Sequence, residues 1–110
     1  MRQDAINTPR MHSEDQGCEL IALNPVDTAT EFEWYQLIIQ PGCQLASEAH
    51  VRSTQEHLSI IEGQMRVELE DDITAIGTIG DTLRYPADIQ HCIKNPGSVT
   101  ARAFLVVHKR

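Results

Sequence analysis

Residues 80–95 read Gly80-Asp81-Thr82-Leu83-Arg84-Tyr85-Pro86-Ala87-Asp88-Ile89-Gln90-His91-Cys92-Ile93-Lys94-Asn95. The glycine and aspartate at the start favour a tight turn, and the proline in the middle tends to end strand pairing because it has no N–H group to donate. The pattern predicts a short strand over residues 82–85, a break, and a second strand that begins at His91. The side chain of His91 is then held rigidly beside a turn.

The spacing within this stretch resembles the second conserved motif of the cupin superfamily. That motif is a glycine, five residues, a proline, one residue, usually a glycine, two residues, a histidine, three residues and an asparagine. Gly80, Pro86, His91 and Asn95 match these positions. Asp88 stands at the second glycine, where aspartate also tolerates turn geometry.

A second stretch, residues 42–63, resembles the first cupin motif. In the family this motif is a histidine, one residue, a histidine, three or four residues, a glutamate, six residues and a glycine. His50 matches the first histidine, Glu56 the glutamate and Gly63 the final glycine. Arg52 stands where the family has its second histidine, so the frame of the motif is present and one of its metal ligands is replaced.

The rest of the chain predicts an all-β fold. From Cys18 onward, strand-like runs alternate with turn signals about every eight to twelve residues, and no stretch shows helical periodicity. The expected strands cover residues 18–23, 31–40, 44–50, 55–62, 64–70, 73–78, 82–85, 91–94 and 99–108. The resemblance implies that these strands form the cupin double-stranded β-helix, a jelly-roll barrel.

The chain is expected to contain one domain and an arm. Residues 1–17 are polar, include Pro9 and Gly17, and follow neither the strand nor the helix period, which predicts a linker or loosely attached arm. Residues 18–110 then form a single cupin domain. A chain of 110 residues is long enough for one domain with a modest core.

Composition excludes several classes of partner. The net charge of −7, from 9 basic and 16 acidic residues, repels a phosphate backbone, so we expect no direct nucleic-acid contact from this chain. No apolar run approaches the roughly 18 residues of a membrane span, and the first residues do not resemble a secretory signal. We expect a cytoplasmic protein without a membrane contact.

The three cysteines are expected to be reduced structural thiols.

Strand alternation predicts which side chains share a face. If Glu56 points into the barrel, His57 points away from it, and if His50 points inward, Arg52 does too. With His91 from another strand, His50 and Glu56 would converge inside the barrel. Two imidazoles and one carboxylate form a ligand set that suits Fe(II) and is compatible with Mn, Ni or Zn.

Arg52 opposes a bound metal, because its guanidinium is permanently charged and cannot ligate a cation. It would instead pair with Glu56 or bind an anionic ligand. Three interpretations therefore stay open. The first is a divalent metal held by His50, Glu56 and His91. The second is a metal-free pocket in which these three residues and Arg52 are hydrogen-bonding groups for a ligand. In the third, the four side chains only satisfy one another.

Several other side chains carry expectations about packing. Phe32, Trp34 and Tyr35 are expected in the core, although one of them could wall the pocket. Asn95 is expected to brace a turn through its amide rather than to touch a ligand.

Among cupins, the chain is similar to the C-terminal sensor domains of bacterial XRE-type helix-turn-helix regulators over about residues 38–108. The likeness is carried by residues 47–50, 55–64 and 83–88, followed by His91 and Asn95. The resemblance implies a small-molecule-sensing domain that forms a homodimer and reaches DNA only through a helix-turn-helix domain not encoded here.

The alternative is a small metal-dependent enzyme, a dioxygenase, isomerase or decarboxylase, in which His50, Glu56 and His91 hold the metal. A purely structural oligomer is a third hypothesis, disfavoured because unpaired polar groups inside a barrel are costly. No residue is assigned a catalytic role.

Overall fold

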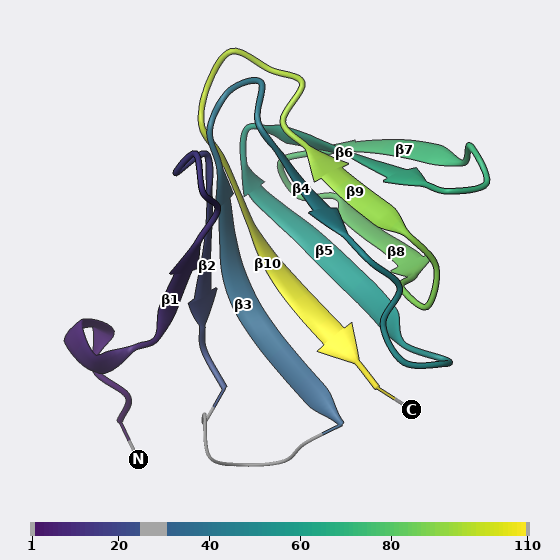
Figure 1. Ribbon diagram of the computed structural model, residues 1–110. Coiled ribbons are helices and arrows are strands. Elements are labelled where there is room, and N and C mark those ends of the chain that lie inside the picture. The colour runs from purple at the N-terminus through teal and green to yellow at the C-terminus, as the bar shows by residue number, and fades with distance from the viewer. Residues whose placement is uncertain (1, 25–30, 110) are drawn as a thin grey trace.

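The computed structural model describes residues 2–24 and 31–109, and this part of the chain is built almost entirely of strands (Figure 1). The strands are β1 (Arg10–His12), β2 (Cys18–Ala22), β3 (Phe32–Ile39), β4 (Gln44–Ser47), β5 (Gln55–Glu62), β6 (Gln64–Leu69), β7 (Thr74–Thr78), β8 (Thr82–Pro86), β9 (His91–Lys94) and β10 (Ala101–His108), after a short 3-10 helix, η1 (Ala5–Asn7). The all-β prediction is confirmed. None of the helices in the described residues is long and apolar enough to span a bilayer.

Two antiparallel sheets face each other across the core. The larger sheet has the strand order β1-β2-β3-β10-β5-β8, and the smaller has the order β4-β9-β6-β7. Strands far apart in sequence therefore lie side by side, as Figure 1 shows for β10 between β3 and β5. From β3 to β10 the chain passes repeatedly from one sheet to the other, so side chains from both sheets can meet at one point of the interior.

Alternation along each strand builds the core between the sheets. Leu37, Leu58 and Ile60 of the larger sheet pack in one cluster with Met65 and Ile93 of the smaller sheet, and all five side chains are buried. Residues between them along the strands point outward, as expected for sheets with one face in the core and the other in water. The core leaves Glu56 and His91 as buried polar groups inside an apolar layer.

The turn from β5 to β6 explains the glycine that ends the first motif. Gly63 has a φ of 71°, in the left-handed region that favours glycine. A Cβ at this position would lie 3.0 Å from both Ala101 Cα and Thr100 O, closer than side chains normally approach. The glycine thus lets the chain turn directly against the start of β10.

One strand lies in a region where the sequence predicted none. Residues 10–12 form β1, in which Met11 pairs with Leu20 of β2. A three-residue strand is too short to show a period of two, so alternation gave no signal. The division of the chain into an arm (1–17) and a domain (18–110) stays a prediction, and residues 1, 25–30 and 110, which it includes, lie outside the described residues.

The aromatic residues of β3 correct another expectation. Phe32 and Trp34, predicted in the core, are exposed on the outer face of the larger sheet, where Phe32 stacks on His108 with 4.2 Å between ring centroids. The reason is alternation, because Leu37 and Ile39 fix the odd-numbered positions of β3 inward. Tyr35 follows the inward set and is half-buried.

Candidate functional site

The structure brings His50, Glu56 and His91 together from three separate segments. Glu56 is the second residue of β5 in the larger sheet, and His91 is the first residue of β9 in the smaller sheet. His50 lies in the loop between β4 and β5, where its backbone N–H donates to the carbonyl of Ala87. Glu56 and His91 are buried, whereas the His50 side chain is 39% exposed.

One carboxylate oxygen is the centre of the cluster. Glu56 Oε2 lies 3.0 Å from His50 Nε2 and 3.2 Å from His91 Nε2. One ligand atom from each of the three residues lies within 4.8 Å of the other two. The His50 and His91 rings meet edge to face, with 5.1 Å between their centroids.

Further hydrogen bonds orient the two buried members of the cluster. The Tyr85 hydroxyl, from β8, donates to Glu56 Oε1 over 2.7 Å. His91 Nδ1 lies 2.8 Å from the carbonyl oxygen of Ile89, and because a carbonyl can only accept, Nδ1 is the donor. The Nε2 atom of His91 is thereby directed at Glu56.

The pKa values follow from these contacts. Burial alone would raise the pKa of Glu56, but the approach of His91, the hydrogen bond from Tyr85 and the charges of both histidines outweigh burial and hold this pKa below its ordinary value. Burial alone would lower the pKa of His91, but Glu56 and the Ile89 carbonyl outweigh it and raise this pKa. Burial and the Glu56 carboxylate together raise the pKa of Tyr85 well above its ordinary value, so the phenol stays a donor.

An unsatisfied nitrogen tests whether the cluster suits a metal. In the part of the chain that the structure describes, His91 Nε2 is buried and makes no hydrogen bond, since its approach to Glu56 at 3.2 Å lacks hydrogen-bond geometry. With the proton on Nδ1, a neutral His91 presents a lone pair to a carboxylate oxygen, which repels it. Either a proton on Nε2 or a cation between the two atoms removes this conflict.

Two of the separations between ligand atoms suit a shared cation. Metal–ligand distances of about 2.0–2.2 Å at right angles place neighbouring ligand atoms about 3.0 Å apart. The two separations from Glu56 Oε2, 3.0 Å and 3.2 Å, agree with this value. Two imidazoles and one carboxylate with open positions therefore fit a divalent transition metal.

Arg52 lies outside this cluster. The prediction that it points inward beside His50 is wrong, because β4 ends at Ser47 and strand alternation no longer applies beyond it. Arg52 is exposed in a turn, which Asp88 Oδ2 holds by accepting the backbone N–H of Ser53 over 3.0 Å. Its charge is therefore solvated and not buried beside Glu56 and His91, so it repels a cation at the cluster less than an inward-facing guanidinium would.

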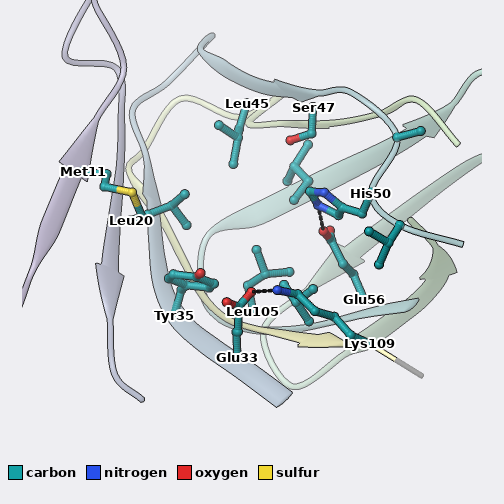
Figure 2. Close-up of a pocket in the computed structure, with 14 residues that line it drawn as sticks. Met11, Leu20, Glu33, Tyr35, Leu45, Ser47, His50, Glu56, Leu105 and Lys109 are labelled. Carbon is teal, nitrogen blue, oxygen red and sulfur yellow. Dashed lines mark hydrogen bonds and ion pairs between the residues drawn. The ribbon is translucent and has the colours of Figure 1, made fainter. Parts of the chain in front are cut away.

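A cavity of about 450 Å³ opens beside the cluster (Figure 2). His50 and Glu56 lie at one end of it, and Tyr35, Glu33 and Lys109 lie together at another part of its wall. Lys109 Nζ pairs with Glu33 Oε1 at 3.1 Å. The remaining wall is mostly apolar and consists of Met11, Leu20, Leu45, Ser47, Ala49, Val51, Ile93, Leu105 and Val107. Its size and lining are typical of a small-molecule site.

Sequence reasoning missed part of this wall. Alternation in β3 could have placed Glu33 on the same face as Tyr35, had the inward positions been set by Leu37 instead of the aromatic residues. No local sequence pattern indicates that Met11 and Lys109 lie in the cavity wall, because their positions depend on strand pairings near the two ends of the chain.

The expectation for Asn95 is confirmed. Its amide nitrogen donates to the carbonyls of Ile39 and Val99, at 2.9 Å and 2.8 Å, and its Oδ1 accepts the backbone N–H of Gly97 at 2.9 Å. This buried side chain ties the turn after β9 to the end of β3. It lies among backbone groups rather than in the cavity.

The two motifs and the facing sheets correspond to a known family. Residues 35–108 match the Cupin_2 family, described as the cupin domain. The chain belongs to this family. The predicted cupin fold is therefore confirmed, and the match runs from within β3 to the end of β10 and includes His50, Glu56 and His91.

A regulator is among the relatives of this cupin domain. The chain is 26% identical over 102 residues to the HTH-type transcriptional regulator SutR of Escherichia coli K12. The matched region covers 92% of this chain and 57% of SutR, so the chain spans a little over half the length of that relative. It is a cupin domain homologous to those of helix-turn-helix regulators.

Solved structures share the fold. The Cupin_2 domain of an XRE family regulator from Enterobacter cloacae aligns with a TM-score of 0.78 at 21% identity, over 86% of this chain and 99% of that one. An HTH_3 family regulator from Vibrio cholerae gives 0.80 at 20% identity, over 92% and 56%. A sugar phosphate isomerase of the cupin superfamily from Silicibacter pomeroyi gives 0.75 at 17% identity, over 100% and 76%.

Proposed function

We propose that this cupin domain senses a small molecule that enters the cavity beside His50 and Glu56. The observation that carries the proposal is the combination of a largely apolar cavity of about 450 Å³ with a polar cluster at its end. Homology to the HTH-type transcriptional regulator SutR supports a sensing role over a structural one. An effector that binds one conformation better than another shifts the population toward that conformation.

The residues that would hold a metal in this site are His50, Glu56 and His91, with Fe, Mn, Ni and Zn as candidates. When bound, the metal would supply a Lewis-acidic attachment point for an anionic or electron-rich group of the effector. The chain itself does the rest of the recognition. Its apolar wall would cover the body of the effector, and the Glu33–Lys109 pair would meet a polar group away from the cluster.

Arg52 keeps a more limited role in this proposal. Its neighbour Val51 lines the cavity, so the exposed guanidinium could reach an anionic effector at the edge of the cavity but not in its interior. We therefore propose that Arg52 contributes to capture of an anion and that His50, Glu56 and His91 contribute to its fixed position.

A regulator architecture would connect sensing to DNA. In this proposal, a helix-turn-helix domain outside these 110 residues would contact DNA, and the acidic cupin domain would respond to the effector in the cytoplasm. Dimerisation of the cupin domain would allow one bound effector to change the relative position of two partner domains. Met11 of β1 lines the cavity, so an effector in the cavity would contact the N-terminal arm and could change its position.

The proposal is tested by ligand-dependent stability. Untagged protein is analysed for bound metals, and its melting temperature is then measured against a panel of small carboxylates and phosphates, with and without Zn(II) or Mn(II). A ligand that binds only the folded state raises the melting temperature with concentration. We expect at least one anion to stabilise the wild type and to lose this effect in Leu105→Trp, which fills the cavity. Stabilisation that is unchanged in Leu105→Trp would place the ligand elsewhere and overturn the proposal.

The alternative is a small metal-dependent enzyme that uses the same three residues. The observation in its favour is Glu33, a half-buried carboxylate that faces the cavity and could serve as a second acid or base. Turnover of a panel compound by metal-loaded protein would establish this alternative. Its loss in Glu33→Gln, with metal binding retained, would assign the proton transfer to that residue.

A further inference from the structure

Tyr85 is a buried phenol whose hydroxyl faces Glu56, one member of the His50–Glu56–His91 cluster. It lies on β8 directly opposite Glu56 of β5, and 7% of the residue is exposed. A buried hydroxyl without a partner is costly, and the partner of this one is Glu56 Oε1 at 2.7 Å. Tyr85 does not line the cavity, so it would act through Glu56 and not by touching an effector.

The two oxygens of Glu56 therefore have different surroundings. Oε2 approaches both histidines, at 3.0 Å and 3.2 Å, whereas Oε1 is turned to Tyr85. A carboxylate that binds a metal through both oxygens must direct both of them at the metal. The hydrogen bond from Tyr85 opposes that rotation, because turning Oε1 away from the phenol would strain or weaken a bond in a buried site, where its loss is costly.

We propose that Tyr85 is a positioning residue that limits Glu56 to one coordinating oxygen, Oε2, and so keeps a coordination position free for a ligand from the cavity. The inference rests on the proposed metal site. His91 has a comparable partner in the Ile89 carbonyl, whereas His50 is anchored by its backbone and its side chain is partly exposed. The two buried ligands are thus fixed. His50 and Glu56 line the cavity, so a position left free between them would be open to a ligand there.

The test compares wild type with Tyr85→Phe, which keeps the ring and removes the hydroxyl. Thr82→Val is the matched control, because Thr82 also lies on β8 and its hydroxyl bonds to Ser59 at 2.9 Å, away from Glu56. Each protein is loaded with Co(II), whose visible absorption reports coordination number, and is titrated with azide as a small anionic probe. The melting temperature of each metal-free protein verifies folding.

In wild type and Thr82→Val, azide is expected to bind the cobalt and change its spectrum. In Tyr85→Phe, the spectrum should already differ before azide is added, and azide affinity should fall by about 10-fold or more, the scale of effects from partners of metal ligands. Identical spectra and azide affinities in wild type and Tyr85→Phe would overturn the proposal.

A crystal structure of cobalt-loaded wild type provides a second measurement that does not depend on the variant. Glu56 Oε1 bonded to Tyr85 and out of reach of the cobalt would support the proposal. Two Glu56 oxygens on the cobalt would overturn it while leaving the metal site intact. Absence of cobalt from the His50–Glu56–His91 cluster would overturn both this inference and the metal site.

Discussion

At the scale of single residues, the site depends on how Glu56 is divided between its neighbours. One oxygen contacts two histidines and the other accepts the Tyr85 hydroxyl. Because His91 Nε2 makes no hydrogen bond within the described residues, a proton or a metal must stabilise the pair. We therefore expect the stability of the His50–Glu56–His91 cluster to depend on protonation when no metal is bound and on the metal when one is bound.

Glu56→Gln should abolish tight metal binding. The amide keeps the shape of the side chain but removes the negative charge, so we expect affinity for Zn(II) or Co(II) to fall by more than about 100-fold, beyond the 10–100-fold range for partners of ligands. Competition with a chromogenic chelator measures the change. His57→Gln, on the outer face of the same strand, is the control and should retain wild-type affinity.

The stability of the metal-free protein should depend on pH through the same pair. The pKa of Glu56 is lowered from 4.5 in the folded protein. The ionised Glu56 therefore stabilises the fold above pH 4.5, and this stabilisation is lost as pH falls through the pKa of the folded state. The pKa of His91 is raised from 6.5, so its contribution is present below pH 6.5 and is lost as pH rises through the folded value. The pair should stabilise the fold most between these two values.

Urea unfolding of metal-free wild type and Glu56→Gln across pH 3–9 measures this contribution. The difference in unfolding free energy between the two proteins should be largest between pH 4.5 and 6.5. A difference that stays constant with pH would show that the Glu56–His91 pair does not contribute to stability through its ionisation. Metal affinity should instead increase as pH rises above 6.5, because a metal binds only the neutral form of His91.

At the scale of elements, turns decide which side chains reach the site. The turn at Gly63 brings β5 back as β6 against the start of β10, and the turn around Ser53 separates His50 from β5 and takes Arg52 out to solvent. The sequence predicted nine of the ten described strands from alternation and turn residues. It placed Arg52 wrongly because a strand was extended beyond Ser47, where alternation no longer gives direction.

Gly63→Ala should cost stability for two reasons. The left-handed backbone strains any other residue by about 1 kcal/mol or more, and the new Cβ would meet Ala101 and Thr100 at 3.0 Å. We expect a total loss of about 2–4 kcal/mol by urea unfolding. Gly42→Ala is the matched control, because Gly42 has a φ of 75° with open space around its Cβ position and should lose only the backbone part. Equal losses in the two variants would show that the contact with β10 is unimportant.

The site itself was predictable only in part. The two motifs predicted that His50, Glu56 and His91 would converge, since their spacing fits a known family. Tyr85 could not be recognised as a partner of Glu56, because that contact depends on the register between β5 and β8. Met11 and Lys109 in the cavity wall depend on pairing near the two ends of the described chain, which local patterns do not report.

At the scale of the whole molecule, the exposed aromatic residues favour self-association. Phe32, Trp34 and Phe104 are each about 40% exposed on the outer face of the larger sheet. We expect the predicted homodimer to use this face. Trp34→Glu should then shift the molar mass measured by light scattering toward that of the monomer, whereas Ile76→Glu, on β7 of the smaller sheet, should not. A dimer unaffected by Trp34→Glu would assign the interface to another surface.

We propose that one divalent metal binds between the two sheets, at the His50–Glu56–His91 cluster beside the cavity. The most direct measurement is anomalous diffraction from a crystal of the untagged protein soaked with one equivalent of Zn(II). We predict a single strong peak about 2.0–2.2 Å from His50 Nε2, His91 Nε2 and Glu56 Oε2. A crystal that takes up zinc only at other residues, or that shows no peak at these three atoms, would contradict the account.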